Sequence, residues 1–160
     1  MEQQNPVLSP RGFFRTLTLL YFSFLSAQLL FAVMAFLNQG STYFDYTDTN
    51  DVFIYAVPVF AVASIVLGIV LYGQQTSELG RKNSLKEKLA AYQSAVLIRM
   101  AFLEAASIFG IVAFFLKGNL FSLLISGLVI LYFISLKPAK ERAEDYLNLS
   151  LDEKRQFYEE

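Results

Sequence analysis

The sequence predicts an all-α integral membrane protein: a bundle of four transmembrane helices, arranged as two hairpins, followed by a helical tail. Three observations predict this class. The chain of 160 residues is 55% hydrophobic and has a mean hydropathy of +0.44, whereas soluble domains are typically about 45–50% apolar. Four apolar segments approach or exceed the roughly 20 residues that span a bilayer. Basic residues also gather at alternate ends of these segments.

The first apolar segment covers residues 13–37 and follows a short N-terminal segment, residues 1–12. Its apolar run is longer than the core of a signal peptide, which is about 7–15 residues, and no small-residue cleavage site follows it. We therefore expect this helix to be retained. The second segment, residues 52–72, contains no charged residue and can cross lipid without a polar partner.

The third segment, residues 85–116, starts with a helix-capping pattern. Ser84 and Glu87 have the S-x-x-E spacing in which each side chain satisfies a backbone donor at a helix start. We expect this helix to begin near Leu85 in the cytoplasm and to enter lipid after about two turns. The fourth segment, residues 120–136, is at the short limit for a spanning helix. Together the four segments form a membrane domain over residues 13–136.

The tail, residues 137–160, is rich in charged residues and is predicted to be helical and cytoplasmic. Ser150 and Glu153 repeat the capping pattern before a short terminal helix. Two interpretations of the tail stay open: it lies on the membrane surface as an amphipathic element, or it binds a partner protein. The larger apolar residues around this second capping pattern are Tyr146, Leu147, Leu149 and Leu151.

The distribution of lysine and arginine predicts the orientation. The loop between the first two segments has none, and the basic residues gather instead at the N-terminus, between the second and third segments, and in the tail. By the positive-inside rule, both termini then lie in the cytoplasm. Short loops, a retained first helix and the absence of cysteine are compatible with a bacterial inner membrane, where we expect the protein.

Composition excludes several kinds of function. The chain has no cysteine and therefore no disulfide or thiolate metal site. It has no histidine, the commonest metal ligand and the usual general base at neutral pH. The net charge of −1 argues against a broad surface for nucleic acid. We expect neither an enzyme nor a bound cofactor.

The third segment carries two charges at different depths. Counting back from Lys117, Arg99 lies about 27 Å and Glu104 about 20 Å below the outer end. Arg99 can reach the headgroups, so it is predicted to be an anchor at the membrane interface. Arg15, at the start of the first segment, is predicted to be a second anchor of this kind. A carboxylate at the depth of Glu104 costs several kcal/mol unless it is protonated, paired or hydrated.

Two interpretations of Glu104 stay open. It is an ion- or proton-binding group, with Gln28 and Ser26 as neighbours that tune it, or it makes a structural hydrogen bond across the bundle to such groups. Glu104 shares one side of its helix with small residues, which predicts that it faces another helix of this chain or of a partner. Ala106 and Gly110 have the small-xxx-small spacing of a helix-packing site.

The residues Glu104, Phe109, Gly110 and Val112 resemble the carboxylate helix of the proteolipid (c-type) subunits of rotary ATPases. The resemblance covers about a quarter of the chain. It implies that Glu104 binds a proton or a sodium ion reversibly, and that two hairpins form the four-helix unit. Proteolipids pack their inner helices through a dense series of glycines, whereas the second segment here has only Gly68 and Gly73. This difference argues against a tight rotor ring.

The loop between the first two segments contains a weak candidate for a metal site. Asp45, Asp48 and Asp51 supply carboxylate oxygens of the kind that calcium prefers. The loop lacks the glycine and the distal glutamate of an EF-hand. We expect the aspartates to act mainly as acidic residues of an outer loop.

These observations predict a small accessory or assembly subunit that packs against a larger membrane protein complex. The alternative is a transport or channel component, coupled to protons or ions, that acts as a homo-oligomer with Glu104 as the titrating group. The expected partners are the lipid bilayer and other integral membrane subunits. Association with further copies of the chain stays open, and nucleic acid is not expected.

Overall fold

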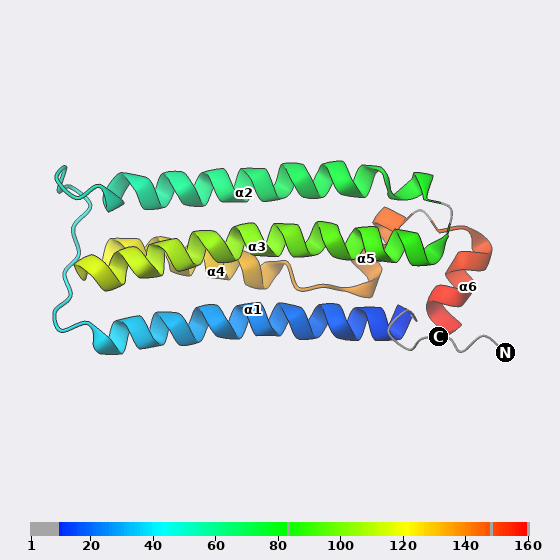
Figure 1. Ribbon diagram of the computed structural model, residues 1–160, viewed down its shortest axis with the longest axis horizontal. Coiled ribbons are helices and arrows are strands. Elements are labelled where there is room, and N and C mark those ends of the chain that lie inside the picture. Colours follow the sequence, from blue (N-terminus) through cyan, green and yellow to red (C-terminus); the bar gives the residue numbers. More distant parts are fainter. Residues whose placement is uncertain (1–9, 83, 148, 160) are drawn as a thin grey trace.

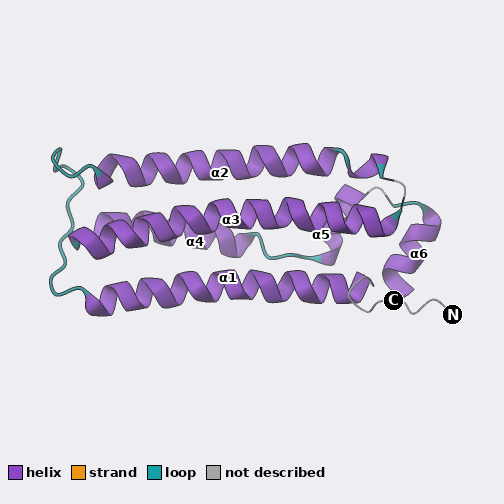
Figure 2. Ribbon diagram, in the orientation of Figure 1, coloured by secondary structure: helices purple, strands orange, loops and turns teal. Residues whose placement is uncertain are grey.

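The computed structural model describes residues 10–82, 84–147 and 149–159, and within these ranges every regular element is a helix. Four helices run side by side, and two short helices lie at one end (Figures 1 and 2). Residues 1–9 of the predicted N-terminal segment lie outside the described residues. The elements are α1 (Pro10–Asn38), α2 (Phe53–Ser77), the 3-10 turn η2 (Leu79–Arg81), α3 (Leu85–Lys117), α4 (Leu120–Ser135), α5 (Lys140–Leu147) and α6 (Leu151–Glu159).

Three of the described helices are long and apolar enough to cross a membrane. They cover Gly12–Asn38, Phe53–Arg81 and Leu85–Lys117, with mean hydropathies of 2.0, 2.6 and 1.9. Large apolar side chains cover their outer surfaces, as Leu30, Leu37 and Val59 illustrate with exposed fractions of 69%, 76% and 69%. Apolar surface of this extent is unfavourable in water and favourable in lipid. The predicted all-α class is therefore confirmed, with three helices that could span a membrane, whereas α4, with 16 residues, is shorter than these three.

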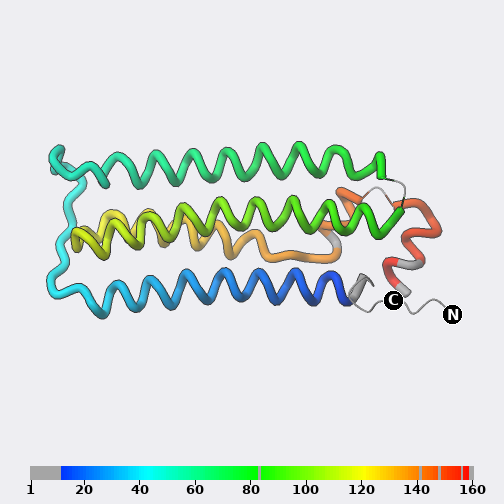
Figure 3. The backbone as a smooth tube through the Cα atoms, in the orientation of Figure 1, coloured from blue at the N-terminus to red at the C-terminus, as the bar shows by residue number. Residues whose placement is uncertain are grey.

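Helix α3 is the centre of the bundle. It lies between α1 and α2, and α4 packs behind it (Figures 1 and 3). Gly110 lets α4 approach closely, because a Cβ atom at this position would overlap the Ser126 hydroxyl and lie 3.0 Å from the Ser122 carbonyl oxygen. Ala106 is also buried, with 2% exposure. The two residues predicted to pack helices thus lie in the core of this chain.

One end of the bundle, the loop end, is closed by the α1–α2 loop, which binds the turn between α3 and α4. Asn119 is 1% exposed. Its Nδ2 donates to the Asp45 carbonyl oxygen at 2.7 Å, and its Oδ1 accepts from the Asp45 and Phe121 amides at 3.2 and 3.1 Å. The backbones of Tyr43 and Leu120 are also hydrogen-bonded at 2.8 Å. The two hairpins are therefore tied together at this end.

The predicted caps are confirmed. Ser84 Oγ accepts from the Glu87 amide at 3.3 Å at the start of α3. At the start of α6 the capping box is complete, because the Ser150 amide donates to Glu153 Oε2 at 2.8 Å and the Glu153 amide donates to Ser150 Oγ at 3.3 Å. Each of these helices therefore begins where a side chain satisfies a free backbone donor.

The tail helices α5 and α6 pack against the other end of the bundle, the tail end (Figure 1). Ala143, Leu147 and Phe157 are fully buried. The Phe157 ring meets the edge of Phe14 in α1 at 5.7 Å, and Glu153 forms an ion pair with Lys88 in α3 at 2.8 Å. The sequence predicted that the tail lies on the membrane surface or binds a partner protein. Neither interpretation included packing of the tail against the helices of the same chain. Leu147 and Leu149 turn inwards, whereas Tyr146 and Leu151 are exposed.

Candidate functional site

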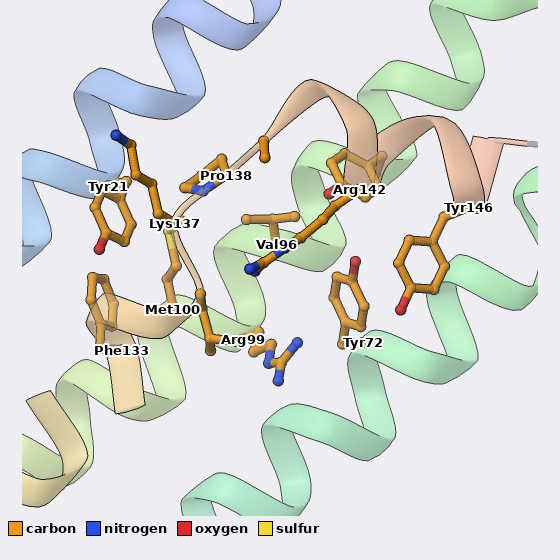
Figure 4. Close-up of a pocket in the computed structure, with 13 residues that line it drawn as sticks. Tyr21, Tyr72, Val96, Arg99, Met100, Phe133, Lys137, Pro138, Arg142 and Tyr146 are labelled. Atoms are coloured by element: carbon orange, nitrogen blue, oxygen red, sulfur yellow. The ribbon is translucent and has the colours of Figure 1, made fainter. Parts of the chain in front are cut away.

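A pocket lies at the tail end because α4 is shorter than its neighbours. The 16 residues of α4 span about 24 Å, whereas the 33 residues of α3 span about 50 Å. The segment after α4 and helix α5 occupy only part of the remaining space. They leave a pocket of about 290 Å³ (Figure 4), which we call the Arg99 pocket. Its lining residues are Tyr21, Tyr72, Tyr92, Val96, Arg99, Met100, Phe133, Leu136, Lys137, Pro138, Ala139, Arg142 and Tyr146.

Arg99 is held between two tyrosine rings. Its Cζ atom lies 5.1 Å from the ring centre of Tyr72 in α2 and 5.8 Å from that of Tyr132 in α4. Its Nη2 donates to the Tyr132 hydroxyl at 2.6 Å. Gly68 lies beside the stem, and a Cβ atom there would make an ordinary contact of 3.6 Å with Arg99 Cγ. The side chain predicted to reach the headgroups is therefore enclosed by three helices.

The second guanidinium of the pocket comes from α5. Arg142 extends from this helix into the pocket (Figure 4), and its Nη1 donates to the Ser135 carbonyl oxygen at 3.1 Å, at the end of α4. Lys137 contributes its stem, while its ammonium group points towards α1 and lies 5.8 Å from the ring centre of Phe22. The lining residues include these three cations and no carboxylate, so the pocket has a positive potential.

Tyrosines form the wall of the pocket on the side of α2 and α5. The Tyr72 ring contacts the Tyr146 ring at 5.5 Å and the Tyr92 ring at 6.4 Å, both edge-on. Tyrosine hydroxyls donate hydrogen bonds, as guanidinium groups do. Donors and positive charge without a nearby carboxylate are the chemical requirements of a site for an oxyanion.

Glu104 lies outside this pocket, and the structure does not bring its side chain to the predicted neighbours. Gln28 is fully buried, and its Oε1 accepts from Ser107 Oγ at 2.6 Å. Ser26 is exposed and donates to the Ser23 carbonyl oxygen at 3.0 Å. No hydrogen bond or ion pair joins the Glu104 carboxylate to any residue that the structure describes.

The position of Glu104 defines an uncovered side of α3. Ala101, Glu104, Ala105 and Ile108 follow one another at helical spacing, on the side of α3 that neither α1 nor α2 covers. Both alanines are exposed, and Glu104 and Ile108 are half-buried. We call these four residues the open α3 face. It combines small side chains, which let another helix approach closely, with an unpaired carboxylate.

The three aspartates of the weak metal candidate in the outer loop each accept hydrogen bonds within their own turns. Asp45 Oδ1 accepts from the Thr47 hydroxyl and amide, both at 2.7 Å, and these bonds hold the pKa of Asp45 below its ordinary value. Asp48 and Asp51 each accept from the amide two residues further on, at 2.9 and 3.1 Å. Among the described residues, no three acidic side chains are grouped to hold a metal ion.

The sequence interpretation missed most of the Arg99 pocket. Arg15, the other predicted anchor, is exposed near the start of α1 and takes no part in it. As site residues, the sequence interpretation named neither Tyr72 and Tyr132, the tyrosines that hold Arg99, nor Arg142. The two tyrosines could have been found from the sequence, because both lie near the tail end of apolar helices, at the same predicted depth in the membrane as Arg99. Arg142 could not be found in this way, because its position depends on how α5 folds back.

No protein-family model matches the chain, and neither does any curated protein or any solved structure.

Proposed function

We propose that this chain is a small integral membrane subunit that binds a membrane-spanning helix of another polypeptide through the open α3 face. In this proposal the chain crosses a bacterial inner membrane four times, with both termini in the cytoplasm. The observation that carries it is the Glu104 carboxylate, which is unpaired among the described residues and lies beside two exposed alanines.

The energetics of the bilayer favour a partner at this position. Glu104 lies about 20 Å from the outer end of α3, inside a hydrocarbon layer of about 30 Å. A charged residue at the centre of a membrane helix costs about 2.5–3.5 kcal/mol or more. A partner helix with a lysine, an arginine, an asparagine or a tyrosine at this depth would satisfy the carboxylate. The exposed Ala101 and Ala105 would let its backbone approach.

A different polypeptide suits this face better than a second copy of the chain. Symmetric pairing of two open α3 faces would bring two Glu104 carboxylates together, and like charges at short range disfavour ionisation of both. A heterologous partner can supply the complementary group. This argument favours an accessory or assembly subunit of a larger complex.

The distribution of charge supports the proposed orientation. The tail end carries the exposed Arg81, Lys82 and Arg155, whereas the α1–α2 loop at the loop end contains no lysine or arginine. By the positive-inside rule, the tail end with α5 and α6 then faces the cytoplasm. Helix α4 spans about 24 Å, which is enough for a thin part of the bilayer.

Gentle detergent extraction of the tagged native protein, followed by mass analysis, tests the proposal. We expect another integral membrane polypeptide in a fixed ratio, and we expect Ala105→Leu to reduce its recovery because the added side chain fills the open α3 face. Ala63→Leu is the matched control, since Ala63 is exposed on a side of α2 away from its buried residues. Recovery of the chain alone, or equal loss from both variants, would overturn the proposal.

The ion-coupled alternative remains a second proposal, and it is also favoured by Glu104 having no hydrogen-bonding partner among the residues that the structure describes. In this reading a homo-oligomer carries protons or ions past Glu104, as the resemblance to proteolipid subunits implies. Glu104→Gln separates the two functions. The amide can still bond to a partner helix, so association survives in the first, whereas transport in reconstituted vesicles is abolished in the second.

A further inference from the structure

We propose that the Arg99 pocket binds a phosphate-bearing anion of the size of a lipid headgroup. The shared chemistry is a phosphate mono- or diester, supplied either by an anionic lipid or by a soluble phosphate compound. This site is separate from the open α3 face and does not depend on the function proposed for that face.

The charge of the pocket is the first argument. Arg99 and Arg142 come from different helices, α3 and α5, and both line the same space of about 290 Å³. Within the part of the chain that the structure describes, no aspartate or glutamate lines the pocket. Two arginines facing one pocket repel each other unless an anion lies between them, and guanidinium groups bind phosphate oxygens through paired N–H bonds.

The hydrogen bonds of Arg99 give the second argument. Tyr132 uses one nitrogen of the guanidinium, at 2.6 Å, while Nε is buried and has no acceptor among the described residues. A buried charged donor without an acceptor is costly. The contacts with the rings of Tyr72 and Tyr132 fix the plane of the group, and a small shift of this plane would present its free N–H groups to a ligand in the pocket.

The size and depth of the pocket limit the ligand. Ligand pockets commonly have about 300–1,000 Å³, so this pocket is suited to a small polar group rather than to a whole nucleotide cofactor. Arg99 lies about 27 Å below the outer end of α3, near the inner boundary of a hydrocarbon layer of about 30 Å. Lipid headgroups and cytoplasmic solutes meet at this level.

The test uses the full chain, purified in detergent and also reconstituted in nanodiscs. Inorganic phosphate is titrated against thermal unfolding in detergent, with sulfate-free chloride buffers of equal ionic strength as the reference. Binding of phosphatidylglycerol and of phosphatidylcholine is compared by native mass spectrometry. We expect Arg142→Gln to weaken binding by about tenfold, the effect of losing one charge-assisted hydrogen bond. Arg155→Gln, which removes the same charge from the exposed side of α6, should leave binding unchanged.

Arg99 provides a second variant pair. Arg99→Gln should abolish binding, and Arg99→Lys should restore part of it, because the charge returns without the paired N–H geometry. A folding defect alone would not follow this order, and the circular dichroism of each variant identifies it. Because Arg142 is exposed, its variant tests the proposal independently of any damage caused at Arg99.

Each outcome has a definite meaning. Selective retention of phosphatidylglycerol that Arg142→Gln weakens would assign the site to a lipid headgroup. Stabilisation by inorganic phosphate without lipid selectivity would assign it to a soluble phosphate. Binding of neither probe would overturn the proposal, and so would equal weakening by Arg142→Gln and Arg155→Gln, since general surface charge would then explain the effect.

Discussion

Arg99 and Glu104 lie five residues apart on the same helix, yet they differ in their surroundings. Arg99 has two aromatic rings and a hydroxyl as partners, whereas Glu104 has no hydrogen-bonding partner among the described residues. Five residues correspond to about 140° around a helix, so the two side chains face different neighbours. Arg99 faces α2 and α4 inside the bundle. Glu104 faces the uncovered side, where the proposed partner helix would satisfy it.

The depths of Arg99 and Glu104 in the bilayer could be predicted from the sequence, but the contacts of Arg99 could not. The depth of each charge follows from counting residues along one helix, which predicted that the Glu104 carboxylate would be costly in lipid unless it is protonated, paired or hydrated. The contacts of Arg99 join it to Tyr132, a residue 33 positions further along the chain. Such a contact depends on the rotation of each helix about its axis, which the apolar composition of α4 does not determine.

Gly118 has a backbone conformation that other residues rarely adopt. It ends α3 with a φ of 75°, and a Cβ atom there would overlap the Gln39 amide and lie 2.6 Å from the Ser41 carbonyl oxygen. We expect Gly118→Ala to destabilise the protein by at least about 1–2 kcal/mol, the cost of a left-handed conformation for alanine. Thermal unfolding in detergent measures this loss. Gly40→Ala, where no atom lies within 4 Å of the new group, is the control and should change little.

Among the helices, the length of α4 determines whether there is space for a pocket at the tail end of the bundle. Had α4 matched α3, it would have filled the space at the tail end, and the Arg99 pocket would not exist. The sequence predicted the end of α4 to within one residue, 136 against Ser135, and the serine caps that begin α3 and α6. It did not predict that α5 folds back, because a cap determines where a helix begins and not what it packs against.

The close contact between α3 and α4 depends on Gly110. Gly110→Ala should destabilise the bundle by roughly 1–3 kcal/mol, because the new methyl group overlaps the Ser126 hydroxyl in a packed interface. Gly127→Ala is the matched control, since nothing lies within 4 Å of its new group. Its better helix propensity should stabilise the protein by up to about 1 kcal/mol. Equal unfolding temperatures for the two variants would contradict the described crossing.

The contact between α6 and α3 should depend on pH. Burial raises the pKa of Glu153, but the hydrogen bonds from Lys88 and Ser150 outweigh it, and the pKa lies below its ordinary value. A lowered pKa means that this stabilisation is complete above the unfolded value of about 4.3 and is lost as the pH falls through the lower folded value. We expect α6 to be bound at pH 7 and to loosen below about pH 4.

A nitroxide label on a cysteine at the exposed Asp152 measures this loosening as a gain in mobility. Glu153→Gln should weaken the contact by about 1–2 kcal/mol and loosen α6 already at pH 7. Asp145→Asn is the control, because Asp145 is exposed on α5 and makes no hydrogen bond or ion pair with another described residue. The assignment fails if the two variants give the same label mobility across this pH range.

For the whole molecule, the all-helical class and the spanning helices followed from composition and from the lengths of the apolar segments. The arrangement of the helices did not, because apolar residues surround each helix and leave its buried side undefined. Ala101 and Ala105 show the consequence. They belong to the same run of small residues as Ala106 and Gly110, but only the latter two are covered by the chain itself.

Labelling with membrane-impermeant maleimide tests the orientation proposed for the whole chain. The protein has no cysteine, so single cysteines report unambiguously. In intact cells we expect a cysteine at the exposed Thr49, in the α1–α2 loop, to be labelled from outside. A cysteine at the exposed Arg81 should react only after the membrane is opened. The reverse pattern would place the termini outside.

Photo-crosslinking from the open α3 face in native membranes tests whether another polypeptide covers this face. A photoreactive amino acid replaces Ala101 in one variant and Ala63 in a second, the latter on an exposed side of α2. We predict that the Ala101 variant forms one discrete adduct with a different membrane polypeptide, and that Ala105→Leu abolishes it. The Ala63 variant should react only with lipid. Adducts with lipid alone from both positions would contradict the account.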